Sequence, residues 1–223
     1  MQVLNHVPNL AQLLAFNPNT KAFLWDMDGT IMETEALHTL ATLQILKKYH
    51  PTLKFSFNQI EEISYGETDP AILSHFHRRG LLSILDIPSF IQLKNQMIIS
   101  ILKEFDAKQI FLQEIRDLMD SIQQAGLKQM VVTSSEKTIT YALLNFLGLD
   151  RLFCHILTRE DTLENKPSPM PYLTAMEYLN CTNNEVIIFE DSPKGLAAAE
   201  ASRAFFLQAN WYNSAKEELR SPI

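Results

Sequence analysis

Acidic residues follow short apolar runs at two separate places in the chain. Asp26 and Asp28 come directly after one run, and Glu190 and Asp191 stand at the end of another. Such runs are typical of buried parallel strands, whose carboxyl ends meet at one edge of a sheet. Carboxylates gathered there repel one another and are costly to desolvate unless a cation neutralises them. The pattern therefore predicts a site for a hard divalent cation, and magnesium suits these oxygen ligands.

Two hydroxyls and a lysine supply groups that could bind a phosphate. Thr133 and Ser134 follow a third apolar run, and Lys166 lies in the loop 165–169, which two prolines would stiffen. A lysine, a hydroxyl and backbone amides beside a metal ion form a receptor for a phosphoryl group. We therefore expect these residues to join the carboxylates in one crevice.

The spacing of the first two acids favours a particular chemistry. Asp26 ends the strand and suits a nucleophile that attacks phosphorus and forms an aspartyl-phosphate, which divides one difficult displacement into two easier steps. Asp28, two residues further on, suits a general acid that protonates the leaving oxygen and later deprotonates the attacking water. A metal ion would offset the repulsion between the anionic nucleophile and the anionic substrate.

The elements that must position these residues alternate between strand and helix. Glycines at 126 and 148 are expected to close two of the helices. Alternating strands and helices predict an α/β fold, a doubly wound, Rossmann-like parallel sheet with right-handed crossovers. The expected strands are 22–25, 130–132, 155–157, 186–189 and 204–207, and the expected helices of this part are 112–125, 138–147, 171–179 and 193–201.

Between the first strand and the others lies a long stretch with helical periodicity and no convincing strand. We expect it to form an inserted helical cap domain over residues 32–110. The α/β core domain then comprises residues 21–31 and 111–223. Residues 1–20 are expected to be an N-terminal leader whose apolar patch could form a helix on the domain surface.

Composition excludes several classes of protein. The 223 residues carry 19 Lys and Arg against 26 Asp and Glu, a formal net charge of −7, which disfavours nucleic acid as a partner. No apolar stretch approaches the length needed to cross a membrane, and no basic segment precedes Lys21 as in a signal peptide. The cysteines at 154 and 181 form no metal or disulfide pattern, which is typical of a reducing compartment. We expect a cytoplasmic monomer.

Four sequence blocks resemble a known family. Residues 26–30, Asp-Met-Asp-Gly-Thr, resemble the DxDGT signature of the haloacid dehalogenase-like hydrolases, most of which are phosphatases. Residues 31–38 continue like the β-phosphoglucomutase and phosphoglycolate-phosphatase branch of that family. Blocks 131–135, 166–169 and 189–195 appear in the family's order. The resemblance covers about residues 21–210.

The resemblance implies a single active site built from the residues singled out above. It implies a magnesium-dependent phosphatase of a small phosphorylated metabolite, with a mobile helical cap that closes over the substrate. The implied roles are a nucleophile at Asp26, an acid/base at Asp28, phosphate binding by Thr133, Ser134 and Lys166, and a metal site made of the Asp26 carboxylate, the Asp28 backbone carbonyl and Asp191, with Glu190 beside it.

Taken singly, several of these residues have simpler interpretations. Thr133, Ser134 or Ser192 could merely begin a helix, and Lys166 could be a solvated loop lysine. In the cap, His75 and His77 stand two positions apart, so on a helix they would face different sides rather than share a metal.

Two positions of the cap bear on the substrate. β-Phosphoglucomutases carry a Lys and an Arg, which grip a second phosphate, where this sequence has Tyr65 and Asp69. An anionic side chain would repel that phosphate, which favours hydrolysis of a substrate whose remote end is neutral or cationic. A His at the position of His38 lies near the cap–core hinge in the family.

Three alternative functions stay open. The nearest is a phosphomutase of the β-phosphoglucomutase type. A phospho-acceptor signalling domain also combines an acidic pocket with a Thr and a Lys, but it has no need of a second carboxyl group such as Asp28. A non-catalytic binding domain is disfavoured because every matched catalytic position keeps a competent residue.

Overall fold

The computed structural model describes residues 2–64 and 67–212, and these divide into two compact units. One unit, the core, runs up to Glu33 and resumes at Ala107, and the other, the cap, comprises Thr34–Asp106. In the described part of the chain no helix is both long and apolar enough to span a bilayer.

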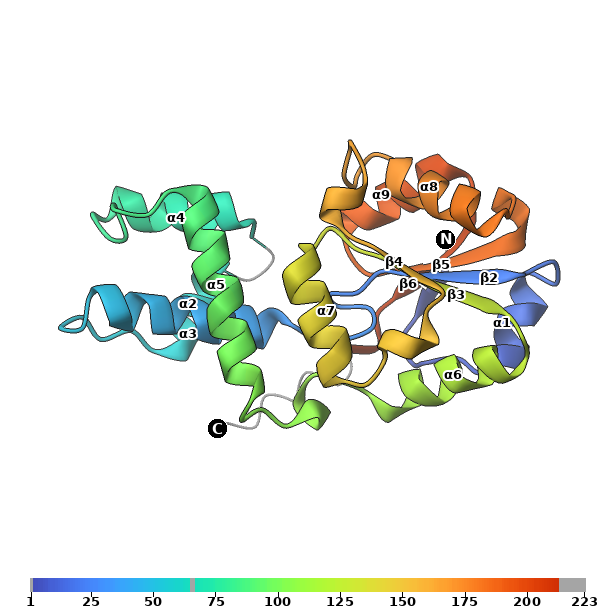
Figure 1. Ribbon diagram of the computed structural model, residues 1–223, viewed down its shortest axis with the longest axis horizontal. Helices are drawn as coiled ribbons and strands as arrows, with labels where there is room; N and C mark the ends of the chain where they lie inside the picture. The colour runs from blue at the N-terminus through green and yellow to red at the C-terminus, as the bar shows by residue number, and fades with distance from the viewer. Residues whose placement is uncertain (1, 65–66, 213–223) are drawn as a thin grey trace. The chain divides into compact units, whose positions relative to one another are not determined.

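A six-stranded parallel sheet forms the centre of the core unit, in the order β1-β6-β5-β2-β3-β4 (Figure 1). The α/β class with a doubly wound parallel sheet, predicted from the sequence, is confirmed. The strands are β1 (Gln2–Leu4), β2 (Ala22–Trp25), β3 (Lys128–Val132), β4 (His155–Leu157), β5 (Val186–Glu190) and β6 (Phe205–Ala209).

Helices cover both faces of this sheet. Figure 1 shows α8 and α9 on one face and α1 and α6 on the other, as expected for a doubly wound fold. The helices of the core are α1 (Leu10–Phe16), α6 (Gln113–Gln124), α7 (Lys137–Phe146), α8 (Met170–Leu179) and α9 (Pro193–Ser202), with short 3₁₀ turns at Ala107–Gln109, Asp150–Leu152, Arg159–Asp161 and Asn183–Glu185.

The register of the central strands determines where their ends lie. Every residue of β2 and β5 is buried, which agrees with their unbroken apolar sequences. Trp25 pairs with Val131 on one side and with Phe189 on the other. The Trp25 ring stacks on that of Phe189, with 4.2 Å between centroids. The residues that follow Trp25, Val131 and Phe189 therefore line one edge of the sheet.

The N-terminal segment contains the helix that its apolar patch predicted and, before it, a strand that the sequence did not predict. Residues Gln2–Leu4 form the edge strand β1, which pairs with β6, and α1 follows with a capping box made by Asn9 and Gln12. A strand of three residues is too short to show a periodic pattern, so the sequence carries no signal for it. Strand β3 also begins earlier than expected, because the amide of buried Gln129 donates to the Met119 carbonyl and so tolerates burial.

The described residues of the cap unit form helices joined by turns and loops, and they include no strand. Its apolar core includes Leu46, Ile60, Phe76 and Phe90, each fully buried. Helix α4 begins after Thr68 with Pro70 in its first turn, and Asp86 caps α5 by accepting the Ser89 amide. The cap helices are α2 (Glu35–Tyr49), α3 (Phe57–Ser64), α4 (Asp69–Arg78) and α5 (Ile87–Leu102).

Candidate active site

The chain turns sharply just after β2 and presents two aspartates. The Asp26 amide donates to the Phe189 carbonyl, which continues the β2–β5 pairing by one residue. The Met27 carbonyl then accepts the amides of Ile31 and Met32, at 2.9 and 3.1 Å. Gly29 has φ +82°, a backbone conformation that L side chains rarely adopt. This turn, residues 26–32, carries Asp26 and Asp28 and is called the nucleophile loop below.

Lys166 reaches from its loop into the carboxylates at the sheet edge. Its Nζ lies 2.6 Å from Asp26 Oδ1, 2.5 Å from Glu190 Oε1 and 2.8 Å from the Val132 carbonyl oxygen. Only 4% of its side chain is exposed. Burial acts to lower the pKa of Lys166, but the carboxylates of Asp26 and Glu190 outweigh it and raise the pKa above its ordinary value. Lys166 is therefore a buried ammonium, and not a solvated loop lysine.

Three carboxylates converge beside that ammonium. Asp26, Glu190 and Asp191 each offer an oxygen, and these oxygens lie within 4.8 Å of one another. Burial, and then the Glu190 charge, raises the pKa of Asp26 well above its usual range. The same two causes, in that order, raise the pKa of Asp191 to about 7. Among the described residues, the one ammonium at this cluster, that of Lys166, does not balance its three carboxylates. The remaining negative charge suits a hard divalent cation.

At two glycines the backbone passes close to the carboxylates of this cluster. A Cβ added at Gly29 would lie 2.2 Å from Asp191 Oδ2, and one at Gly195 would lie 1.7 Å from Glu190 Oε1. Glycine at both positions therefore leaves room for the two carboxylates. The Thr30 hydroxyl donates to Asp191 Oδ1 at 3.4 Å. The donor set and its surroundings fit a metal ion held by carboxylate oxygens.

Glu190 is held more firmly than the sequence indicates. The Tyr172 hydroxyl donates to Glu190 Oε1 at 2.9 Å, and the Ser192 amide and hydroxyl both lie 3.2 Å from Oε2. Ser192 also begins α9 by accepting the Gly195 amide, so its interpretation as a helix N-cap is correct. Tyr172 was not among the predicted site residues, because it lies within an apolar helical pattern that resembles ordinary core.

Asp28 is oriented by the segment after β3. The Ser135 hydroxyl donates to Asp28 Oδ2 at 2.5 Å, and the buried Thr133 hydroxyl accepts the Ser135 amide at 3.0 Å. Ser134 is exposed beside them. Helix α7 has its N-cap at Glu136, so neither Thr133 nor Ser134 begins that helix. Sequence reasoning missed Ser135, although it stands in the same hydroxyl-rich block.

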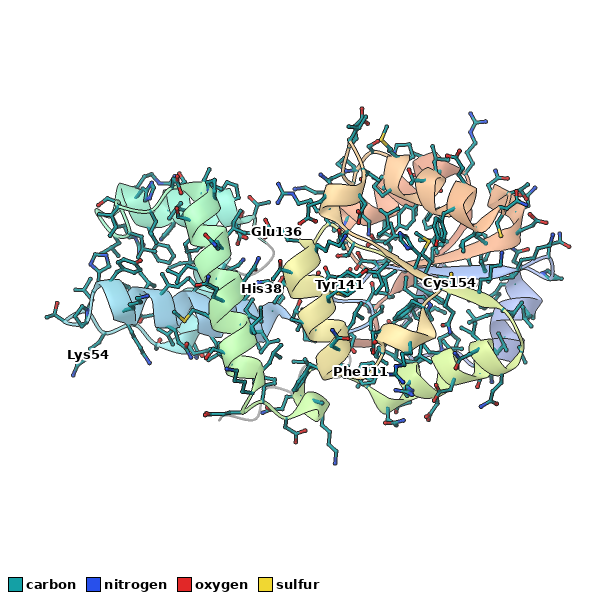
Figure 2. All side chains as sticks on the ribbon, viewed as in Figure 1. His38, Lys54, Phe111, Glu136, Tyr141 and Cys154 are labelled. Carbon is teal, nitrogen blue, oxygen red and sulfur yellow. The ribbon has the colours of Figure 1, made fainter. Side chains whose placement is uncertain are left out.

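The cap unit contains a second buried lysine. Lys94 on α5 forms an ion pair with Asp69, and the side chains are 6% and 20% exposed. This pairing offsets the charge of Asp69, so the expected repulsion of a second phosphate no longer follows from Asp69 alone. Tyr65, the other position of that expectation, lies outside the described residues. His38 lies on α2, where its Nδ1 is buried without a hydrogen-bond partner in the described part of the chain (Figure 2).

Other predicted features of the chain have structural explanations. His77 Nε2 lies 3.1 Å from the carbonyl oxygens of both Leu82 and Leu85, and therefore secures the turn after α4. Arg78 donates to the Ser74 hydroxyl on the same exposed helix face. Cys154 and Cys181 are unpaired thiols. The two histidines of the sequence pair thus form no joint metal site with other His, Cys, Asp or Glu among the residues described.

Comparison with known proteins places the chain in a family. The profile of the haloacid dehalogenase-like hydrolases matches residues 23–209, most of the chain. The chain therefore belongs to the haloacid dehalogenase-like hydrolase family, as its four motif blocks predicted.

Two sequence relatives and one solved structure illustrate the range of similarity. A phosphoglycolate phosphatase of Xylella fastidiosa is 28% identical over 210 residues, covering 87% of this chain and 83% of the relative. A β-phosphoglucomutase of Mycobacterium tuberculosis is 27% identical over 220 residues, covering 86% and 81%. The crystal structure of CbbY from Rhodobacter sphaeroides in complex with phosphate has a TM-score of 0.71 and 24% identity, covering 86% and 88%. The last similarity concerns the fold.

Proposed function

We propose that this chain is a magnesium-dependent phosphatase of a small phosphorylated metabolite and that it works in the cytoplasm. The observation that carries the proposal is the arrangement of Lys166 against Asp26 and Glu190, with Asp191 completing a cluster of three carboxylates. Family membership and the named phosphatases among the relatives support the reaction class.

Asp26 acts as the nucleophile in the first step. One of its carboxylate oxygens forms a bond to phosphorus while the bond from phosphorus to the substrate's leaving oxygen breaks. The Asp28 carboxyl group gives its proton to that leaving oxygen, so the product departs as an alcohol. The Ser135 hydroxyl donates to one oxygen of Asp28, which orients the carboxyl group for this transfer.

The second step returns the chain to its starting state. A water molecule attacks phosphorus while the Asp28 carboxylate takes one of its protons, and the bond between phosphorus and Asp26 breaks. Inorganic phosphate leaves, and Asp28 is protonated again for the next turnover. Asp28 therefore acts as an acid in the first step and as a base in the second, while Asp26 carries the phosphoryl group between them.

Lys166 and the hydroxyls bind the transferring group. The Lys166 ammonium already contacts Asp26, so a phosphoryl group attacked by Asp26 would meet that positive charge. Thr133 and Ser134 are the proposed hydroxyl contacts. Asp26, the Asp28 backbone carbonyl and Asp191 would hold the magnesium ion, with Glu190 beside them. When bound, the ion offsets the repulsion between the anionic nucleophile and the phosphate.

Turnover of p-nitrophenyl phosphate tests this function. We expect magnesium-dependent release of phosphate that excess chelator abolishes and that Asp26→Asn lowers by about 10⁴-fold or more in kcat. Asp120→Asn is the matched control, because Asp120 is partly exposed on α6 and pairs with Arg116. An Asp26→Asn protein that turns over as fast as the parent would refute the nucleophile.

A phosphomutase is the second candidate. The relatives include a β-phosphoglucomutase, and the Asp69–Lys94 pair offsets the charge that argued against a second phosphate. A mutase would interconvert sugar phosphates and would depend on a sugar bisphosphate primer. Interconversion of glucose phosphates with and without that primer separates the two activities, and we expect hydrolysis to dominate.

A further inference from the structure

Two side chains after β6 donate to the nucleophile loop. The Trp211 Nε1–H donates to the Thr30 carbonyl oxygen at 2.9 Å, and the Tyr212 hydroxyl donates to the Ile31 carbonyl oxygen at 2.7 Å. Each bond joins positions 181 residues apart in the chain. Trp211 and Tyr212 together are called the latch below. No step of the proposed mechanism uses either side chain directly.

The two latch residues and the two residues whose carbonyls they bind are all buried. Trp211 is 2% exposed and Tyr212 is 3% exposed, while Thr30 and Ile31 are completely buried. Within the loop, the carbonyls of Met27 and Met32 accept the loop's own amides. The two adjacent carbonyls of Thr30 and Ile31 accept instead from the latch. Removing a latch donor therefore leaves a buried carbonyl unsatisfied, which favours movement of the loop.

The latch is itself anchored from both sides. The Asn210 amide, directly before it, donates to the carbonyl of Leu4 at the end of β1 at 2.8 Å. The Trp211 ring lies 6.0 Å from that of Phe189, on the strand that ends in Glu190. The latch thus joins the end of β1, strand β5 and the nucleophile loop.

Asp28 depends on this loop for its position. It lies between the strand end at Asp26 and the latched carbonyls, and its backbone forms a bridge with Met32. Ser135 holds its carboxylate from the opposite segment. A general acid must lie within hydrogen-bond reach of the leaving oxygen, and a shift of about 1 Å can reduce the rate by about 10²-fold. A loop free to move would keep Asp26, which β5 also holds, but would misplace Asp28.

We propose that Trp211 and Tyr212 are positioning residues that hold Asp28 where it protonates the leaving group. This inference rests on the proposed function, because it assumes that Asp28 is the general acid. It predicts a defect that depends on the leaving group. An alkoxide needs a proton to depart, whereas p-nitrophenolate is a stable anion that leaves without one.

The test compares two phosphate esters, β-glycerol phosphate and p-nitrophenyl phosphate, at saturating magnesium. The readout is kcat/KM, which covers only the steps through phosphoryl transfer to Asp26, so the later hydrolysis does not affect it. We expect Tyr212→Phe, which deletes one oxygen, to lower kcat/KM for β-glycerol phosphate at least about tenfold more than for p-nitrophenyl phosphate. Trp211→Phe should show the same difference, and it provides a second variant should one fail to fold.

A matched control separates positioning from general destabilisation. The buried Thr20 donates its hydroxyl to the Asn17 carbonyl oxygen at 2.6 Å, and this partly buried bond lies just before the other end of β2. Thr20→Val removes it without changing the shape of the side chain, and should slow both esters equally or not at all. Equal losses for the two esters in the latch variants, or no loss, would overturn the proposal.

A further variant distinguishes this proposal from the function on which it rests. Asp28→Asn should show the largest difference between the two esters. If Asp28→Asn shows that difference and the latch variants do not, the latch proposal is wrong and the acid/base role stands. If Asp28→Asn shows none, the acid/base role of Asp28 is wrong, and the proposed action of the latch falls with it.

Discussion

Two buried lysines in this chain occupy opposite electrostatic situations. Lys166 in the core unit contacts the carboxylates of Asp26 and Glu190 together, with Asp191 close by. Lys94 in the cap unit pairs with Asp69, whose side chain is partly exposed. The core lysine therefore leaves an excess of negative charge, whereas the cap lysine is matched by one carboxylate. In this chain the two buried lysines therefore differ in whether their partners leave negative charge for a further cation to balance.

The two lysine sites also differ in the contacts that hold their side chains in place. Tyr172 and Ser192 hold Glu190, and two glycines give the acidic cluster the space it needs. Such supporting bonds and clearances keep the groups where the chemistry needs them. In the cap, His38 lies near the Lys94 charge with a buried nitrogen that has no partner among the described residues. The cap site therefore has a polar atom without a hydrogen bond among the described residues, and we expect it to tolerate substitution better than the acidic cluster of the core.

Replacing each lysine in turn gives the most direct test of this difference. Lys166→Met should destabilise the protein by about 3–5 kcal/mol, because it leaves buried carboxylates without their cation, and should lower kcat/KM by about 10²- to 10³-fold. Lys94→Met should cost only about 1–2 kcal/mol, because water can reach Asp69. Urea unfolding in the presence of chelator measures the first quantity, and ester turnover measures the second. Equal costs for the two variants would contradict the distinction.

Two glycines with positive φ, one in each unit, provide a second comparison, for which we expect smaller effects. Gly29 in the core has φ +82° and Gly80 in the cap has φ +71°, but only the first has a carboxylate in the path of an added Cβ. Gly80→Ala should cost about 1–2 kcal/mol of stability and leave turnover unchanged. Gly29→Ala should add a clash with Asp191 and weaken magnesium affinity about 10- to 100-fold. Magnesium titration of turnover gives the affinity, and thermal melting gives the stability. Unchanged magnesium affinity in Gly29→Ala would remove Asp191 from the metal site.

The smallest effect concerns the pH dependence of stability in the cap. Burial, and then the charge of Lys94, lowers the pKa of His38 well below its usual range. Because the unfolded chain takes up this proton first, the contribution of His38 is present above about pH 6.5 and is lost as the pH falls below it. His38→Asn should therefore lose less stability between pH 7.5 and 5.5, with a difference in slope of up to about 1.4 kcal/mol per pH unit.

Urea unfolding at a series of pH values measures that slope. His6→Asn, which changes an exposed imidazole of the core unit, is the control and should follow the parent. Parallel slopes for His38→Asn and the parent would show that the pKa of His38 is not lowered in the folded protein.

The core sheet and the gathering of the acidic cluster followed from the sequence. Strands β2 and β5 are unbroken apolar runs, and Asp26 and Glu190 stand where those runs end. Parallel strands bring such ends to one edge whatever the details of packing, so the meeting of these residues could be predicted. The edge strand β1 could not, because three residues carry no pattern.

Other contacts of the site depend on packing that no local pattern encodes. Tyr172 looks like any apolar helix position until α8 packs on the sheet and aims its hydroxyl at Glu190. The pairing of Asp69 with Lys94 joins two cap helices across 25 residues of sequence. Asp69 taken alone suggested a repulsive charge, and only its partner corrected that interpretation.

The sequence by itself determined the class of fold, the family and the residues that gather at the carboxyl ends of the strands. These follow from short-range apolar patterns and from the geometry that all parallel sheets share. Only the tertiary structure decided which charges are balanced and which carbonyls the latch holds. Hydrogen bonds and ion pairs depend on distances of a few ångströms between segments far apart in the chain, and packing alone sets those distances.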